Sequence, residues 1–324
     1  RRRWTVCSMR SRRCHGEPRQ LLPALPYLRH PWRREMDLYY DKTSTRSEQD
    51  YIFIESLGNG PTVVLVHGWG LHGGVWRDLA VRLARSFRVL IPDLPGHGRS
   101  RGVHTEASLA GLADDLSRRL TEPAIWVGWS LGALVALATA CNQPQAISRL
   151  VLVGATPKFV QAPDWPCAML PATLAQFARD LESDYRDTLA RFLSLQMGDG
   201  ATAHAAVRQL RAMLMEHGEP EPAALRSGLQ WLANTDLRAD LPAITVPTLV
   251  LHGAHDRLVP PAAAEFLVAR LPMARLTLIP SAGHAPFLSH PDATWSALNE
   301  FLRDPRDDAM DGGGGATSGT VANA

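Results

Sequence analysis

The sequence predicts an α/β fold in which a doubly wound, mostly parallel sheet carries a helical lid inserted between two late strands. Three observations support this prediction. Short apolar runs alternate with helical patterns along most of the chain, which is the order of βαβ units. One such run leads through a Gly-Trp-Ser-Leu-Gly turn at residues 128–132 directly into an apolar helix. The nearly one hundred residues between Val153 and Thr248 contain no convincing strand.

The expected strands are short and apolar, as is typical of strands buried on both faces of a parallel sheet. A weakly alternating run at residues 51–55 is the first candidate, and a Gly-Asn-Gly-Pro turn follows it at residues 58–61. Helical patterns cover residues 76–86 and 109–120. The remaining expected strands are residues 62–67, 88–91, 124–127, 150–153, 248–251 and 276–279.

Apolar residues of the insertion recur at spacings of three and four, which indicates an amphipathic helix. They are Leu174, Phe177, Leu181, Tyr185, Leu189 and Phe192. Residues 205–215 and 223–233 also have helical patterns. We expect these helices to form a lid over residues 158–240, above the carboxyl ends of the strands, where open α/β sheets keep their sites. Such a lid would supply substrate contacts and exclude water.

Both ends of the chain differ in composition from its middle. Residues 1–34 contain ten arginines and one glutamate, a charge of +9, and because the whole chain carries +2, the remainder carries about −7. This segment is a basic arm, an Arg-rich transit peptide, or an upstream extension of a reading frame that starts at Met36, and we favour the last. We therefore expect residues 1–50 to be an extension outside the fold, residues 51–303 to form the domain, and the Gly-rich residues 304–324 to be disordered.

Composition excludes several classes of protein. The mildly acidic body argues against a nucleic-acid-binding surface. No apolar stretch of about 18 residues lacks charges, so no membrane span is expected. The four cysteines show no paired spacing, which argues against a disulfide framework and favours a reducing compartment. We expect a cytoplasmic monomer.

The turn at residues 128–132 is typical of a nucleophile elbow, in which a serine lies on a tight turn between a strand and a helix. The turn needs small neighbours, hence a glycine two residues to either side of Ser130. The following helix directs its free N–H groups and the positive end of its dipole toward a developing oxyanion.

A serine nucleophile needs a base, and the base needs an orienting acid. Downstream of Ser130, Asp256 and His284 occur in the order that this chemistry uses, each on the loop after an expected strand. Parallel strands place these loops at one edge of the sheet, so the three side chains can converge. We predict His284 as the general base and Asp256 as the group that fixes its tautomer.

Other polar residues compete with this interpretation. His252 and His255 lie close together and could suggest a metal site, but no further ligand cluster is present and no metal is expected. Asp236 is a rival orienting acid, although it precedes the relevant strand. His97 and His204 are more typical of loop or surface residues.

Two N–H groups are needed for the oxyanion hole. The backbone of Leu131 is one candidate, and Trp69, in the Gly-rich loop at residues 67–70, is the other. The indole of Trp69 would then face the pocket, unless it is merely a packing residue. We interpret the second Gly-rich loop, residues 93–100, as a structural turn.

These motifs resemble those of the α/β-hydrolase superfamily and, more narrowly, the pimeloyl-[acyl-carrier protein] methyl ester esterases of biotin biosynthesis. The resemblance runs from about residue 51 to about residue 302. Its most particular parts are the Gly-Trp-Ser-Leu-Gly elbow, the Gly-Trp-Gly loop at residues 68–70 and the lid segment Arg-Phe-Leu-Ser-Leu-Gln at residues 191–196. The others are residues 71–77, 93–102, 124–127, 164–166, 228–237 and 282–291.

The resemblance implies the α/β-hydrolase fold and a serine carboxylesterase that uses no cofactor and releases methanol from an ester carried on acyl-carrier protein. The implied substrate contacts are Trp69, Ser130, Leu131, Phe192, Leu193, Ser194, Leu195 and Gln196. Because a carrier protein is generally acidic, basic lid residues would dock it, namely Arg191, Arg208 and Arg211. After Gly198 the lid departs from the pattern of the family. The alternatives are a broad-specificity carboxylesterase of short-chain esters without a carrier partner, a C–C bond hydrolase and a non-catalytic binding protein on the same fold.

Overall fold

The described part of the chain comprises residues 51–103, 108–184, 187–189, 191–192, 207–208, 210, 212–213 and 216–304 of a computed structural model. The expected extension at residues 1–50 lies outside the described residues, as does the expected tail apart from its first residue.

A seven-stranded sheet in the order β1-β3-β2-β4-β5-β6-β7 forms the centre of the fold. All neighbouring pairs are parallel except β1 and β3, which are antiparallel. The predicted fold class, a mostly parallel sheet with a helical insertion between late strands, is confirmed. The strands are β1 (Ile54–Leu57), β2 (Thr62–Val66), β3 (Arg88–Pro92), β4 (Ala124–Trp129), β5 (Ile147–Val153), β6 (Thr248–Gly253) and β7 (Ala274–Ile279).

The burial of each strand explains how closely its residue range could be predicted from the sequence. Every residue of β2, β4 and β6 is buried, as apolar runs in the middle of a parallel sheet should be. The sequence predicts the first strand at residues 51–55, but β1 begins only at Ile54, and all its residues are half-buried. An edge strand that is not fully buried has a weak hydrophobic pattern, which accounts for the shift.

The helices cover the sheet and connect its strands. α3 packs on β2, β4 and β5, α2 packs on α3, and α8 and α10 pack on β6 and β7. α3 is apolar on all sides and ten of its residues are buried, as expected for a helix enclosed by protein. Five helices begin with proline, whose fixed φ suits the first helical position. The helices and 3₁₀ turns are η3 (Gly73–Trp76), α1 (Arg77–Leu83), η4 (Gly98–Ser100), α2 (Leu109–Ser117), α3 (Leu131–Asn142), η5 (Pro144–Ala146), α4 (Pro171–Ser183), α7 (Pro222–Asn234), η6 (Leu241–Ala243), α8 (Pro261–Arg270), α9 (Pro286–Ser289) and α10 (Pro291–Leu302).

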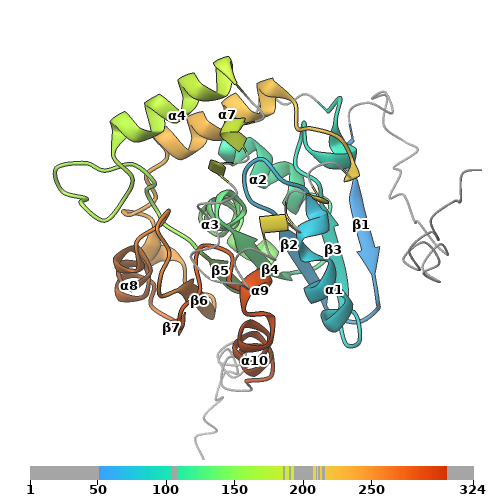
Figure 1. Cartoon of the computed structure of the whole chain (residues 1–324). Coiled ribbons are helices and arrows are strands. Elements are labelled where there is room, and N and C mark those ends of the chain that lie inside the picture. Colours follow the sequence, from blue (N-terminus) through green and yellow to red (C-terminus); the bar gives the residue numbers. More distant parts are fainter. Residues whose placement is uncertain are drawn as a thin grey trace, which may run out of the picture. The chain divides into compact units, whose positions relative to one another are not determined.

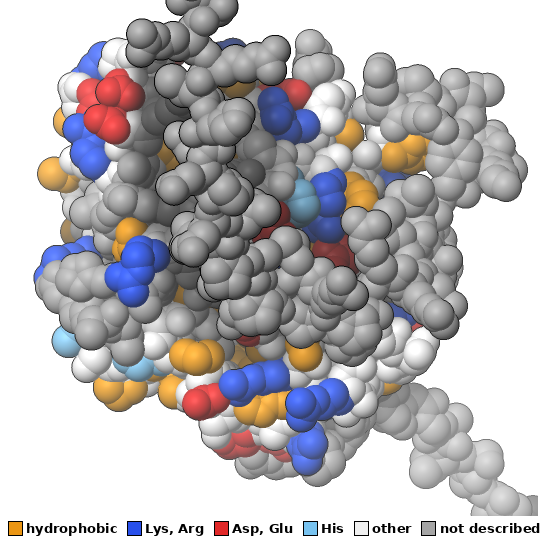
Figure 2. Space-filling model, turned by 45° about the vertical axis from the view of Figure 1, so that its right-hand side comes forward, with side chains coloured by type: hydrophobic (Ala, Val, Ile, Leu, Met, Phe, Trp, Pro, Cys, Tyr) orange, Lys and Arg blue, Asp and Glu red, His pale blue; other side chains and the backbone are white. Residues whose placement is uncertain are grey.

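The insertion between β5 and β6, which we call the lid, contains α4 and α7. These two helices contact each other and lie above the sheet (Figure 1). Within the described residues of the lid only isolated β-bridges occur, and no strand. None of the helices in the described ranges is long and apolar enough to span a membrane. Figure 2 shows one face of the molecule, on which basic and acidic side chains lie close together among the described residues.

Candidate active site

Ser130 lies between β4 and α3 in a backbone conformation that few residues adopt. Its φ is 55° and its ψ is −116°, and among the described non-glycine residues only Ser130 and Ser281 have positive φ. Such a conformation costs about 1–3 kcal/mol and persists where the surrounding structure enforces it. The Ser130 amide donates to Val153 O at 3.0 Å, which ties the turn to the end of β5.

The two glycines that flank Ser130 are required by close backbone approach. A Cβ atom on Gly128 would overlap the carbonyl oxygen of Gly132. A Cβ atom on Gly132 would overlap the carbonyl oxygen of Val66, at the end of β2. The turn is therefore wedged between its own helix and the neighbouring strand, which is why the sequence needs glycine at both positions.

Asp256 and His284 come together on the loops after β6 and β7. Nδ1 of His284 lies 2.7 Å from Oδ2 of Asp256, and both side chains are fully buried. The other carboxylate oxygen accepts the backbone N–H groups of Leu258 and Val259 at 2.8 and 2.9 Å. Burial by itself would raise the pKa of Asp256, but its interaction with His284 and the backbone hydrogen bond from Val259 hold it below its ordinary value, so the carboxyl is ionised.

His284 is held beside the elbow by the end of β4. The indole Nε1 of Trp129 donates to the carbonyl oxygen of His284 at 2.9 Å, and the two rings lie 5.8 Å apart between centroids. A Cβ atom on Gly154, after β5, would lie 3.0 Å from Nδ1 of His284. Because Nδ1 faces the carboxylate, we assign the ring proton to Nδ1 and a lone pair to Nε2. This atom is buried and has no hydrogen-bond partner among the described residues.

A second histidine touches the same carboxylate. Nε2 of His252 lies 2.9 Å from Val259 O and 3.3 Å from Oδ2 of Asp256, and the His252 side chain is fully buried. Burial lowers the pKa of His252, so the ring is neutral and Nε2–H is the donor to the carbonyl. The sequence indicates His252 only as a weak candidate for a metal ligand. In the structure its hydrogen bond to Val259 O stabilises the loop that carries Asp256.

The two candidate oxyanion donors lie near the elbow. Leu131 is the first residue of α3, so its amide has no acceptor within the helix. The loop that carries Trp69 also passes close to the elbow. A Cβ atom on Gly68 would lie only 3.4 Å from Cβ of Ser130.

The indole of Trp69 is buried against the lid. Its Nε1 donates to Leu225 O of α7 at 2.9 Å. Its ring meets Phe177 and Phe192 edge-on, with centroids 5.4 and 5.1 Å away. The indole of Trp69 is therefore a packing group, held by residues of the lid.

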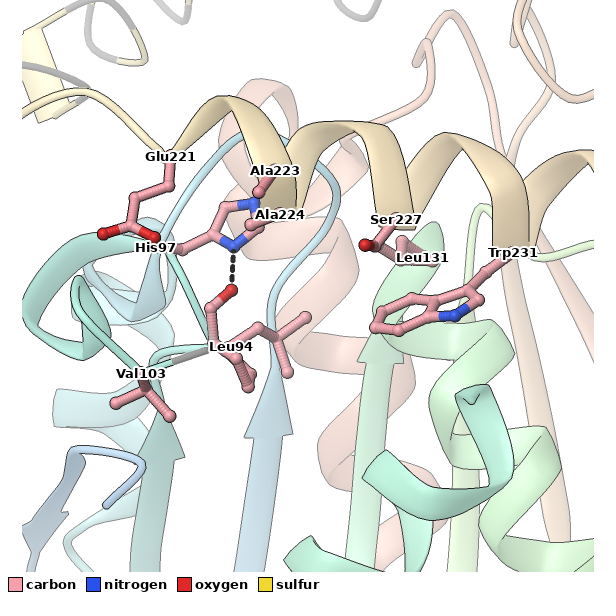
Figure 3. Close-up of a pocket in the computed structure, with 10 residues that line it drawn as sticks. Leu94, His97, Val103, Leu131, Glu221, Ala223, Ala224, Ser227 and Trp231 are labelled. Atoms are coloured by element: carbon pink, nitrogen blue, oxygen red, sulfur yellow. Dashed lines mark hydrogen bonds between the residues drawn. The ribbon is translucent and has the colours of Figure 1, made fainter. Parts of the chain in front are cut away.

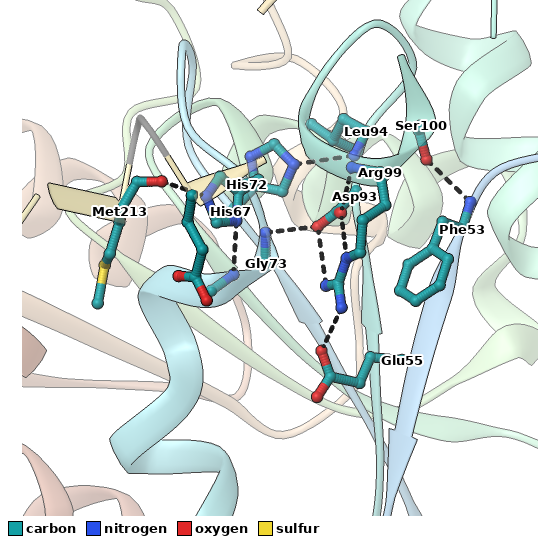
Figure 4. A network of polar contacts seen from close by, with 12 residues as sticks. Phe53, Glu55, His67, His72, Gly73, Asp93, Leu94, Arg99, Ser100 and Met213 are labelled. Atoms are coloured by element: carbon teal, nitrogen blue, oxygen red, sulfur yellow. Dashed lines mark hydrogen bonds and ion pairs between the residues drawn. The ribbon is translucent and has the colours of Figure 1, made fainter. Parts of the chain in front are cut away.

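The Gly-rich loop after β3 is organised by a buried carboxylate (Figure 4). Asp93 accepts the backbone N–H of Gly73 at 2.7 Å and the backbone N–H and Nε of Arg99, both at 2.8 Å. Arg99 also contacts Glu55 of β1 at 2.7 Å. Burial opposes the charge, but the hydrogen bonds from Arg99 hold the pKa of Asp93 below its ordinary value.

The same loop is joined to the loop after β2 by His67. Its Nδ1 donates to Gly68 O at 2.9 Å, and its Nε2 accepts the Leu94 amide at 2.8 Å (Figure 4). Burial, followed by the influence of His97, lowers the pKa of His67 to about 3, so the ring is neutral. The two loops are therefore joined into one unit beside the elbow.

A cavity of about 300 Å³ lies between this unit and α7 (Figure 3). It reaches the elbow at Leu131. Its remaining lining is Leu94, Pro95, His97, Val103, Glu221, Ala223, Ala224, Ser227 and Trp231. Trp69 does not line this cavity. His97, which the sequence suggested as a loop or surface residue, is indeed on a loop but is buried.

Some predicted lid contacts can be placed. Phe192 is half-buried against Trp69, as described above. Arg191 is largely exposed and lies 3.7 Å from Asp180. Arg208 is also exposed. The predicted contacts Leu193, Ser194, Leu195 and Gln196, the predicted docking residue Arg211, and His204 lie outside the described residues.

The rival residues do not join the site. Asp236 pairs with Arg238 at 2.8 Å and with Lys158 at 3.0 Å. His255 is exposed. Within the described ranges no group of three or more histidine, cysteine or acidic side chains is placed to hold a metal ion.

The sequence of this chain is similar to those of known hydrolases. Residues 61–291 match the family described as alpha/beta hydrolase fold. The chain belongs to the α/β-hydrolase family. This hydrolase is 44% identical to the pimeloyl-[acyl-carrier protein] methyl ester esterase of Xanthomonas oryzae pv. oryzae over 249 residues, which cover 77% of this chain and 98% of that relative.

Two solved esterase structures are similar to this hydrolase. The thermophilic esterase from Thermogutta terrifontis, with malate bound, shares 28% identity with a TM-score of 0.67 over 78% of this chain and 93% of its own. The esterase from Exiguobacterium antarcticum shares 25% identity with a TM-score of 0.72 over 78% of this chain and 96% of its own. Identity to the pimeloyl-[acyl-carrier protein] methyl ester esterase is therefore well above identity to these two esterases.

Proposed function

We propose that this hydrolase cleaves the methyl ester of pimeloyl-[acyl-carrier protein] in biotin biosynthesis, releasing methanol and a free carboxylate. The observation that carries the proposal is the strained Ser130 just before α3, next in the chain to Trp129, whose indole holds the His284 that Asp256 orients. The 44% identity to an esterase of that name supports the choice of substrate.

In the proposed mechanism Ser130 is the nucleophile. Its Oγ attacks the ester carbonyl carbon while its proton passes to Nε2 of His284. The C–O bond to the methoxy group then breaks, and methanol leaves with the proton from His284. Water attacks the acyl-enzyme, again giving a proton to His284, and the carboxylate departs as Ser130 recovers its proton. Asp256 stays ionised and stabilises the imidazolium at both stages.

We assign the oxyanion hole to the backbone N–H groups of Leu131 and Trp69. Both are fixed before substrate arrives, the first by the helix that it begins and the second by the anchored indole of Trp69. Donors held in place in this way stabilise the charge on the carbonyl oxygen without reorganising during the reaction.

The proposed partner is the carrier protein, docked on the lid. Arg191 and Arg208 are exposed there, and Arg211 is the third proposed docking residue. Basic residues on a mildly acidic body would steer an acidic carrier to the lid rather than to the rest of the surface. We take residues 158–240 as the extent of this lid and the cytoplasm as the compartment of the reaction.

The proposal is tested with the full chain, wild type and Ser130→Ala. Hydrolysis of pimeloyl-[acyl-carrier protein] methyl ester and of p-nitrophenyl butyrate is measured for both. We expect only the wild type to turn over, with kcat/KM for the carrier-linked ester at least about tenfold above that for the small ester. A wild type that hydrolyses the small ester and ignores the carrier-linked one would instead be a broad-specificity carboxylesterase.

A further inference from the structure

His97, which lines the cavity described above, holds an unused hydrogen-bond acceptor beneath the first turn of α7. Its Nδ1 lies 2.9 Å from Pro95 O, and because a carbonyl only accepts, Nδ1 carries the proton. Burial lowers the pKa of His97, so the ring is neutral and Nε2 carries a lone pair that can accept a hydrogen bond. This Nε2 is buried with no partner among the described residues, and Figure 3 shows it directed toward the first turn of α7. A buried acceptor without a partner is unfavourable unless a ligand supplies the missing donor.

Ser227 supplies a donor in the opposite wall. Its hydroxyl projects from α7 into the cavity (Figure 3) and makes no hydrogen bond with any described residue. Ser227 follows Ala223 and Ala224, which cover His97, by four and three residues. It therefore lies on the same face of α7, about one turn or 5.4 Å further along.

We propose that this cavity is a subsite for a secondary amide, whose N–H donates to Nε2 of His97 and whose carbonyl accepts from the Ser227 hydroxyl. An amide is the neutral group that offers a donor and an acceptor side by side. A carboxylate cannot donate to His97, and the negative charge of Glu221 in the wall disfavours it. The rest of the lining, including Leu94, Leu131 and Trp231, suits an apolar chain on either side of the amide.

The position of the subsite fits the proposed function, on which the choice of substrate rests. The sheet order β3-β2-β4 separates the loop of His97 from Ser130 by two strand spacings, about 10 Å. The arm that joins an acyl chain to a carrier protein begins with a thioester followed by a secondary amide. Ten bonds separate that amide nitrogen from the methyl ester carbonyl of the pimeloyl chain, about 12 Å when extended.

An amide reaches His97 when the first turn of α7 lifts from the loop that it covers. Two hydrogen bonds hold that turn. The Glu221 amide donates to Gly96 O at 2.8 Å, and the Gly102 amide donates to Oε1 of Glu221 at 2.8 Å. Substrate entry beneath α7 and occupation of the subsite are therefore one event.

The test compares two methyl esters that differ in the amide. One is the N-acetylcysteamine thioester of monomethyl pimelate, and the other is its S-pentyl thioester, which has a similar length and no amide. We expect wild-type kcat/KM to be about tenfold higher for the amide-bearing ester, and the ratio to fall to about threefold or less in His97→Phe and in Ser227→Ala. Because each ratio is taken within one protein, a general loss of folding or activity cancels. Ser296→Ala, at an exposed position of α10, is the matched control and should keep the tenfold ratio.

A wild-type ratio within twofold of unity, or a ratio unchanged in both variants, would overturn the subsite. If neither pimeloyl ester is hydrolysed, the proposed function fails, and the subsite is then tested separately by inhibition of p-nitrophenyl butyrate hydrolysis. There, N-heptylacetamide should inhibit several-fold better than N-heptyl-N-methylacetamide, which lacks the N–H, and His97→Phe should abolish the difference. This result would support the subsite even if neither pimeloyl ester is hydrolysed, whereas equal inhibition in the wild type would refute it.

Discussion

Oδ2 of Asp256 lies 2.7 Å from Nδ1 of His284, and neither side chain is exposed to solvent. The contact places the imidazole proton on Nδ1 and leaves Nε2 with a lone pair. A carboxylate shielded from water holds this tautomer more firmly than an exposed one, because no solvent competes for the hydrogen bond. The proposed role of His284 as a base depends on this relationship more than on any other.

Replacing Asp256 with asparagine should keep the fold and abolish most of the activity. The amide oxygen can still accept from Leu258 and Val259, but its NH₂ group would face Nδ1 of His284 and force the proton onto Nε2. We expect kcat for p-nitrophenyl butyrate to fall about 10⁴-fold, as when a triad acid becomes an amide. Unchanged melting serves as the control, and a variant that keeps a tenth of the wild-type kcat would show that His284 needs no carboxylate.

His252 should act as a positioning residue for Asp256. His252→Leu removes the donor to Val259 O at 2.9 Å and the ring beside Oδ2 of Asp256. A buried carbonyl without a partner costs about 1–3 kcal/mol, so the loop should loosen and kcat should fall about tenfold with little change in KM. His252→Gln, which keeps an N–H donor, should recover part of kcat. If the melting temperature fell while kcat stayed constant, His252 would stabilise the fold without positioning Asp256.

The sequence was sufficient for those parts of the fold that have strong local patterns. Fully buried strands such as β2 and β4 are continuous apolar runs, and the elbow needs its two glycines in fixed places. The half-buried edge strand β1 has no continuous apolar run and no glycine-marked turn of this kind, so the sequence predicts its start three residues too early. Strand order and register depend on contacts between distant segments, which a local pattern does not contain.

The site was predictable only in part for the same reason. Asp256 and His284 could be proposed because each follows a strand, and parallel strands bring such loops together. The roles of other residues depend on distant partners: the indole of Trp69 donates to Leu225, and His252 meets a backbone carbonyl seven residues away. A spacing pattern cannot show that such a side chain is buried or which atom it faces.

Gly228 should be essential for the position of Trp69. A Cβ atom at residue 228 would lie 2.6 Å from Cδ1 and 3.1 Å from Nε1 of Trp69, against a ring that is already hydrogen-bonded to Leu225. Gly228→Ala should therefore displace the loop of Trp69 and lower kcat for p-nitrophenyl butyrate about tenfold, even though alanine favours the helix by about 1 kcal/mol. Steady-state kinetics and thermal melting would be measured together. If kcat were unchanged, the Trp69 amide would not need its indole to be anchored.

Charge reversal at Arg191 should affect the carrier-linked ester selectively. The side chain is 66% exposed, lies 3.7 Å from Asp180 and donates to Thr188 at 3.2 Å, so much of its charge stays open to an acidic partner. We expect Arg191→Glu to lower kcat/KM for the carrier-linked ester about tenfold at low salt and less at 0.3 M salt, where charges are screened beyond about 6 Å. Arg303→Glu, at the exposed end of α10, is the control. Equal loss with p-nitrophenyl butyrate would refute the docking role.

Acid should destabilise the protein through His67. Its pKa in the folded state is about 3, below the ordinary value of 6.5, so between these values the unfolded state binds more protons. The contribution of the neutral ring is fully present above pH 6.5 and is lost as pH falls toward 3, reaching about 2 kcal/mol by pH 5. Urea unfolding at pH 7.5 and pH 5 would measure it, with His67→Gln expected to be less stable at pH 7.5 but to lose about 2 kcal/mol less on acidification. If the free energy of unfolding fell equally in the wild type and the variant, protonation of His67 would not cause the loss of stability in acid.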